Sequence, residues 1–320
     1  MYTEIFKNVY KVVKTQEGYL ASRFTEKQLE HYKSQSVQAE DRSLDSAGVC
    51  LDFYTDAKQI SFSYRAAHFS RRYVGFDFYE NSIFRKHIEE ALDTKQSTIT
   101  QPLDNEGIKR VTVYVPNLSQ ITIYDMNFGN FKPVNEIYSE RLLFLGDSIT
   151  QGMVALSPSL SYPTQVARNL NAQLLNRGVG GVRFDPDSLD ENDEYDPTMI
   201  FIAYGINDIY HLKSLEELPK VLKQADLYLD KLKKIYKTAK VCVLTPIWCL
   251  RYDEEESFKE MFDEYAGKLN ELTVKYGFLS VNGLSLVPHD TKYFQDHSVH
   301  PADSGFNYYA SNLQKAINDK

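Results

Sequence analysis

The stretch RLLFLGDSITQG, residues 141–152, decides how the second half of the chain folds. The apolar run 142–145 is typical of a short buried strand, and the turn residues Gly146, Asp147 and Ser148 then end it. Residues 162–170 have a helical pattern, so the serine lies between a strand and a helix. Ligands of open α/β sheets bind at the carboxyl ends of the strands, which makes Ser148 a candidate nucleophile.

Three later segments also carry polar groups after apolar residues. They are NRGVGG at 176–181, GIND at 205–208 and FQDHSVHP at 294–301. A serine is a useful nucleophile only if a base takes its proton, and the last segment offers two imidazoles and a carboxylate. Because parallel strands end at one edge of a sheet, we expect all four segments to meet there.

The motifs GDSIT, NxGxxG, GxND and DxxxHP, in this order, resemble the GDSL or SGNH hydrolase superfamily. The resemblance covers about residues 141 to 318. It implies that the four signature residues of that superfamily are Ser148, Gly181, Asn207 and His300. By the same resemblance, His300 accepts the proton of Ser148 while the serine attacks an acyl carbon.

The resemblance also implies an oxyanion hole, the set of donors that stabilises the negative oxygen of the tetrahedral intermediate. Its donors are the backbone N–H groups of Ser148 and Gly181 and the side-chain amide of Asn207. Gly178 and Gly180 compete for the place of Gly181, and alignment on Asn176 selects Gly181.

The group that orients the imidazole is open at this point. In the family a carboxylate usually lies three residues before the histidine, but that position is His297 here and the carboxylate is Asp296. Either one extra loop residue still lets Asp296 reach His300, or a backbone carbonyl orients the ring. Asp147 and Asp208 are expected to brace their loops.

The chain is expected to contain two domains, residues 1–135 and 136–320. Segments 60–64 and 111–115 alternate apolar and polar residues, which indicates an antiparallel, jelly-roll-like β-sandwich. The second domain alternates strands with helices, which predicts a three-layer α/β fold of the flavodoxin-like type. Its five parallel strands are expected at 142–145, 173–175, 199–203, 241–244 and 279–281.

A sandwich before a GDSL domain resembles the two-domain carbohydrate esterases of family two. This resemblance implies a serine esterase that removes acetyl or other short acyl groups, on a carbohydrate or another small-molecule ester. The alternatives are a general short-chain esterase, thioesterase or lysophospholipase-like enzyme, or a carbohydrate-binding protein with a decayed hydrolase domain. Trp248 could line the substrate pocket, with core packing as the equal alternative.

Composition restricts the remaining classes. A net charge of −8 argues against nucleic-acid binding, and the sequence has no apolar run long enough to span a membrane. Its three cysteines are too few and too scattered for a disulfide framework or a zinc site. The first residues, MYTEIFK, lack the apolar segment of a signal peptide, so we expect a cytoplasmic protein. The histidines lack the paired spacing of a metal site and the glycines lack a phosphate-binding pattern, so we expect no metal and no organic cofactor, while the oligomeric state stays open.

Overall fold

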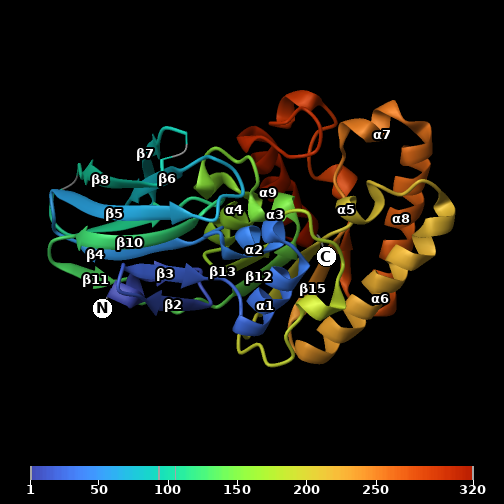
Figure 1. The fold of residues 1–320 in the computed structure, drawn as a ribbon, viewed down its shortest axis with the longest axis horizontal. Helices are drawn as coiled ribbons and strands as arrows, with labels where there is room; N and C mark the ends of the chain where they lie inside the picture. Colours follow the sequence, from blue (N-terminus) through green and yellow to red (C-terminus); the bar gives the residue numbers. More distant parts are fainter. Residues whose placement is uncertain (1, 93, 105, 319–320) are drawn as a thin grey trace.

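Two antiparallel sheets form the first part of the chain in the computed structural model, which describes residues 2–92, 94–104 and 106–318 (Figure 1). One sheet has the strand order β1 (Phe6–Lys7), β4 (Cys50–Thr55), β9 (Lys109–Tyr114), β6 (Gly75–Glu80) and β7 (Ile83–Glu89), with β11 (Phe131–Pro133) on β4. The other has the order β2 (Lys11–Lys14), β3 (Tyr19–Ser22), β10 (Gln120–Asn127), β5 (Gln59–Ala67) and β8 (Gln96–Pro102).

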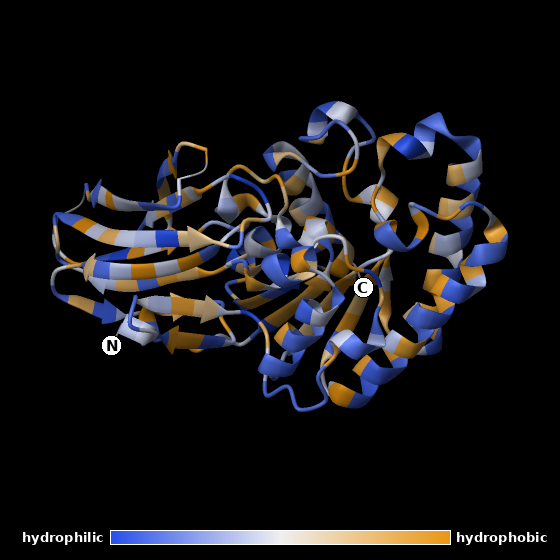
Figure 2. Ribbon diagram, in the orientation of Figure 1, coloured by the Kyte–Doolittle hydropathy of each residue, from blue (hydrophilic) through white to orange (hydrophobic). Residues whose placement is uncertain are grey.

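The apolar sides of these two sheets form one core. Phe53 of the first sheet and Phe62 of the second are both fully buried in it. Figure 2 shows the hydrophobic residues alternating with polar ones along these strands, as expected where one face of each sheet is covered. The predicted β-sandwich is therefore confirmed.

Two helices, α1 (Glu26–Gln35) and α2 (Val37–Leu44), interrupt the sandwich between β3 and β4. Thr25 and Gln28 form a capping box at the start of α1, and Ser36 caps α2. In Figure 1 the two helices lie over the junction between the sandwich and the second half of the chain. The Gln28 side chain of α1 donates to Ser188 O in that second half at 2.9 Å. The predicted domain boundary at residue 135 thus stays a prediction, because residues before it also pack against the second half of the chain.

The third sheet, in the second half of the chain, is entirely parallel and confirms the predicted α/β fold. Its order is β13 (Gln173–Gly178), β12 (Arg141–Gly146), β14 (Met199–Ala203), β15 (Lys240–Leu244) and β16 (Leu279–Val281). The chain runs from β12 to β13 on one side of β12, and the next strand, β14, lies on the other side. The strand order therefore reverses at β12. A reversal of this kind opens a crevice at the carboxyl ends of the strands.

Helices cover this sheet. The pair α4 (Tyr162–Asn169) and α9 (Asp303–Asn318) pack together, as do α6 (Leu218–Ile235) and α8 (Glu256–Lys275). The shorter helices are α3 (Ser148–Gln151), α5 (Ile206–Ile209) and α7 (Leu250–Glu254). Short 3₁₀ turns are η1 (Tyr2–Ile5), η2 (Pro158–Leu160), η3 (Pro186–Ser188), η4 (Leu215–Glu217), η5 (Gly283–Ser285) and η6 (Thr291–Tyr293). Within the described ranges, no helix combines the length and apolar character needed to cross a bilayer.

Candidate active site

Ser148 begins helix α3 directly after strand β12, at the crevice. Asp147 caps this helix, because its Oδ1 accepts the N–H of Ile149 at 2.9 Å. A Cβ on Gly146 would lie 2.1 Å from Thr150 Oγ1, so only glycine allows so tight a turn. The first N–H groups of a helix have no acceptor within it, which leaves the N–H of Ser148 available to a ligand.

The side chains of Ser148, His300 and Asp296 form one continuous chain of hydrogen bonds. Ser148 Oγ lies 2.9 Å from His300 Nε2, and His300 Nδ1 lies 2.6 Å from Asp296 Oδ2. Ser148 is only 7% exposed, so solvent competes little for its hydroxyl. The structure thus brings together the three residues that the sequence selected for proton transfer.

The loop before α9 explains how a carboxylate four residues away reaches the histidine. Phe294 and Pro301 pair as an antiparallel bridge that closes the loop. Inside it, Asp296 Oδ1 accepts three backbone N–H groups at 2.9–3.0 Å, those of residues 298, 299 and 300. Burial raises the pKa of Asp296, but the hydrogen bonds from His300 and the backbone outweigh it, so the pKa is lowered. Asp296 is therefore an anion beside the imidazole.

The three glycines after β13 have different surroundings. The N–H of Gly178 donates to Asn176 Oδ1 and that of Gly180 to Gln151 Oε1. Within the described part of the chain, the N–H of Gly181 has no acceptor, and its φ of +81° is one that glycine adopts freely. Of the three candidates, Gly181 alone thus has an available donor.

Asn207 lies in the first turn of α5, which follows β14, the strand next to β12. Its amide nitrogen is 3.1 Å from Val182 O and 3.4 Å from Asp147 Oδ2. The contact with Asp147 is long for an N–H···O hydrogen bond, so one amide hydrogen is held weakly. Asp147 therefore links the loops of Ser148 and Asn207, as the sequence analysis expected of a bracing residue.

Two buried carboxyl groups near the site have raised pKa values. Burial raises the pKa of Asp147 to about 6 and that of Asp208 to about 7. Within the described part of the chain, Asp208 Oδ1 accepts one long hydrogen bond, from Phe184 N at 3.3 Å, and the buried Oδ2 has no hydrogen-bond partner. Low solvation with few donors disfavours the charged form.

These shifts predict a pH dependence of stability. A carboxyl group with a raised pKa binds more protons in the folded than in the unfolded state, so it stabilises the fold at low pH. That contribution is lost as the pH rises through about 7. Asp208→Asn should therefore become more stable relative to wild type from about pH 5 to pH 8, by about 1 kcal/mol or more. Urea unfolding at both pH values measures this, and an unchanged difference between the two proteins would contradict it.

Trp248, the predicted pocket residue, is only 2% exposed. Its Nε1 donates to Asp253 Oδ2 at 3.0 Å, and its ring packs against His289 and Phe294. Phe294 closes the loop that carries His300, so the contact of the Trp248 ring with Phe294 supports this loop. This geometry favours the packing alternative for Trp248.

Helix α2 contributes residues that the sequence analysis missed. Arg42 Nη1 donates to Gly180 O at 2.7 Å, across 138 positions of sequence. Gln151 accepts the N–H of Gly180 and donates to Asp45 Oδ2 at 2.6 Å. Ser36, the N-cap of α2, is a local signal for the start of this helix, but nothing local indicates that the helix reaches the glycine loop.

The described residues contain no group of three or more His, Cys, Asp or Glu side chains placed to bind a metal ion. The side chains of Cys50, Cys242 and Cys249 are buried, and no disulfide joins these three cysteines.

Comparisons with known proteins identify the family and the fold. A model described as the GDSL-like lipase/acylhydrolase family matches residues 144–307, and no curated protein matches the chain. Among solved structures, the salicylyl-acyltransferase SsfX3 from a tetracycline biosynthetic pathway has a TM-score of 0.79 and 15% identity, covering 98% of this chain and 94% of that one.

Two esterases have the same fold. An active-site mutant of a family two carbohydrate esterase from Clostridium thermocellum has a TM-score of 0.65 and 17% identity, covering 85% of this chain and 91% of that one. The acetyl xylan esterase Est2A from Butyrivibrio proteoclasticus has a TM-score of 0.63 and 14% identity, covering 100% and 96%. At these identities the likeness establishes the fold.

Proposed function

This chain is an ester-bond hydrolase that belongs to the GDSL-like lipase/acylhydrolase family, and from that premise we propose that it removes short acyl groups, acetyl above all, from a carbohydrate ester. The observation that carries the proposal is the hydrogen-bond chain from Ser148 Oγ through His300 to Asp296. An intact chain of this kind also argues against a decayed hydrolase domain.

The geometry supports a two-step mechanism. His300 Nε2 accepts the hydroxyl proton as Ser148 Oγ attacks the ester carbonyl, and Asp296 stabilises the imidazolium. The imidazolium then gives that proton to the leaving alcohol, which leaves an acyl-serine. Water attacks the acyl-serine in the second step, with His300 again as base, and the carboxylic acid is released.

The negative oxygen formed in both steps needs donors that are already in place. We assign this role to the N–H groups of Ser148 and Gly181 and to the amide of Asn207. Helix α3 fixes the first donor and the glycine loop fixes the second. The weakly held amide hydrogen of Asn207 can turn from Asp147 to the oxyanion, because that contact is only 3.4 Å.

Asn207→Ala should lower kcat by about 10²- to 10³-fold with little change in KM, because the hydrogen bond strengthens as the oxyanion forms. Steady-state kinetics with 4-nitrophenyl acetate give both constants. Asn312→Ala, whose amide donates to Leu286 O, changes the same side chain outside the site and serves as the control. An unchanged kcat in Asn207→Ala would remove this residue from the oxyanion hole.

The sugar part of the proposal is supported by the resemblance to two-domain carbohydrate esterases and by the shared fold of the family two esterase and the acetyl xylan esterase. Acyl transfer to an alcohol is the second candidate, because the acyltransferase SsfX3 aligns over 98% of this chain. Both reactions use the same acyl-serine and differ only in the molecule that attacks it.

The test measures 4-nitrophenol release from the acetate and butyrate esters and acetate release from an acetylated sugar. A stoichiometric label from diisopropyl fluorophosphate, located on Ser148 by mass spectrometry, identifies the nucleophile. Added alcohols that yield alkyl acetate instead of acetate would favour transfer. A protein that hydrolyses none of these esters and takes up no label at Ser148 would contradict the proposal.

A further inference from the structure

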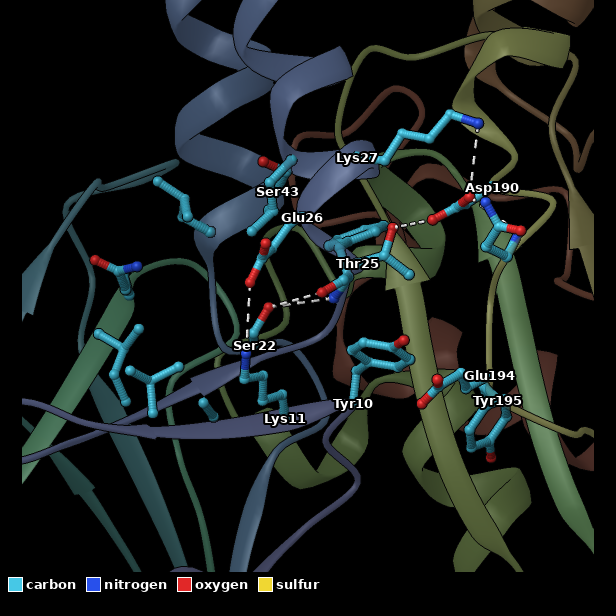
Figure 3. Close-up of a pocket in the computed structure, with 18 residues that line it drawn as sticks. Tyr10, Lys11, Ser22, Thr25, Glu26, Lys27, Ser43, Asp190, Glu194 and Tyr195 are labelled. Carbon is cyan, nitrogen blue, oxygen red and sulfur yellow. Dashed lines mark hydrogen bonds and ion pairs between the residues drawn. The ribbon is translucent and has the colours of Figure 1, made fainter.

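Two cavities lie on either side of helices α1 and α2, and their charged groups differ. The cavity in Figure 3, of about 730 Å³, lies between the sandwich and the loop that carries Asp190. Its charges pair with one another, because Lys11 Nζ is 3.4 Å from Glu26 Oε1 and Lys27 Nζ is 3.6 Å from Asp190 Oδ1. Glu194, which also lines the cavity, has no ion-pair partner among the described residues, so this cavity offers no unpaired cation to an anionic ligand.

The second cavity, of about 390 Å³, is lined by residues of the two helices and of the loop after β13, among them Gly181. Arg42 and Arg183 both line it. A Cβ on Gly181 would lie 2.7 Å from Arg42 Nη1, so the guanidinium packs directly against this glycine. A positive charge is thus fixed beside the proposed oxyanion donor.

Among the described residues, neither arginine forms an ion pair with a carboxylate. Within residues 2–92, 94–104 and 106–318, Arg42 donates only to Gly180 O, and no side-chain hydrogen bond or ion pair involves Arg183. Three of the carboxylates around them have donors: Asp41 from His68, Asp45 from Ser70 and Gln151, and Asp185 from His31 and Gln35. Asp208 is near enough to feel the charge of Arg183, but its pKa stays raised by burial, and no ion pair between these two side chains is present among the described residues. Arg42 is half-buried, and an unpaired cation in such a place is costly unless an anion joins it.

We propose that Arg42 and Arg183 bind a carboxylate carried by the ester substrate, so that the enzyme is selective for acidic esters. This inference rests on the proposed function, which places the ester carbonyl at Gly181. A planar guanidinium can donate two parallel hydrogen bonds to a carboxylate, which favours this anion. The carboxylate can belong to the acyl part or to the alcohol part, as in an acidic sugar, and both sources can be tested.

The experiment uses two matched pairs of esters. On the acyl side, mono-(4-nitrophenyl) succinate is compared with 4-nitrophenyl butyrate. On the alcohol side, 4-acetoxybenzoate is compared with 4-acetoxybenzamide, which has the same shape but no charge. For each pair, kcat/KM is measured for wild type, Arg42→Gln, Arg42→Lys and Arg183→Gln.

Wild type should prefer the acid in at least one pair by about 10-fold or more, the effect of a hydrogen-bonded charge pair. Arg42→Gln should remove most of that preference, mainly through KM, and Arg42→Lys should restore only part of it because an ammonium lacks the two-pronged donor. Arg65→Gln makes the same change in net charge on the sandwich, where Arg65 pairs with Glu17, and should leave the preference intact.

A binding measurement keeps this inference separate from the proposed function. Calorimetry compares 4-acetamidobenzoate with 4-acetamidobenzamide, and succinanilic acid with butyranilide, none of which needs to react. Binding of an acid that weakens about 10-fold in Arg42→Gln would support the site even if no ester is hydrolysed. Equal binding and equal kcat/KM of acid and neutral partner in both pairs would overturn it, as would an equal loss for both members in Arg42→Gln.

Discussion

Asp296→Asn is expected to lower kcat by about 10⁴-fold, nearly as far as His300→Ala. Asp296 Oδ1 accepts three backbone N–H groups, so the asparagine oxygen should keep that place. Its NH₂ group then faces His300 Nδ1, where the carboxylate now accepts at 2.6 Å. A donor opposite Nδ1 favours the tautomer that carries its proton on Nε2, and that tautomer cannot accept the proton of Ser148.

The measurement is kcat for 4-nitrophenyl acetate in Asp296→Asn, His300→Ala and the double variant. Residues that act as one unit are not additive, so the double variant should be no slower than His300→Ala alone. Asp290→Asn serves as the control, since Asp290 is an exposed carboxylate of the preceding loop that pairs with Lys292. A loss below about 10-fold in Asp296→Asn would mean that another group orients the imidazole.

Local patterns were sufficient to predict the parallel sheet. The apolar run 142–145 and the turn residues after it are short-range features, and they correspond to strand β12 and the start of α3. Strand β13 continues through Asn176 to Gly178, three residues beyond its expected end at residue 175. Glycine and asparagine are poor strand formers, and here pairing with β12 on the inside of the sheet overrides that preference.

The open question about the histidine partner could not be answered from spacing. Whether Asp296 reaches His300 depends on how the loop closes. The loop closes through a bridge between Phe294 and Pro301, and the residue pattern does not indicate that these two residues pair. The role of α2 at the glycine loop was equally hidden. Arg42 of α2 and Gly180 after β13 meet because the sandwich and the parallel sheet pack together with α2 at their junction. No local sequence pattern predicts that packing.

Arg23→Met is expected to lower the free energy of unfolding by about 3–5 kcal/mol. Arg23 is 1% exposed and lies between the sandwich and the parallel sheet. Its guanidinium donates to five backbone carbonyl oxygens at 2.6–3.4 Å, those of residues 42, 43, 45, 176 and 178. Burial lowers its pKa to about 10, so the group stays charged at neutral pH.

A buried ion pair can often be replaced by apolar residues at little cost, because both charges leave together. Arg23 differs, since its main acceptors are backbone oxygens that remain after the mutation. Each buried carbonyl left without a donor costs about 1–3 kcal/mol, and methionine supplies no donor. Arg23→Lys should recover only part of the loss, because one ammonium cannot reach acceptors on both α2 and β13.

Denaturant unfolding of wild type, Arg23→Met and Arg23→Lys at neutral pH measures these differences, with the exposed Arg65→Met as the control. The carbonyls that Arg23 binds lie at the end of α2 and at the end of β13, on either side of the glycine loop. The folded fraction of Arg23→Met should therefore also hydrolyse esters more slowly, because the Gly181 donor loses its support. A loss below about 1 kcal/mol would show that the two sheets hold together without this residue, and that water can replace its hydrogen bonds.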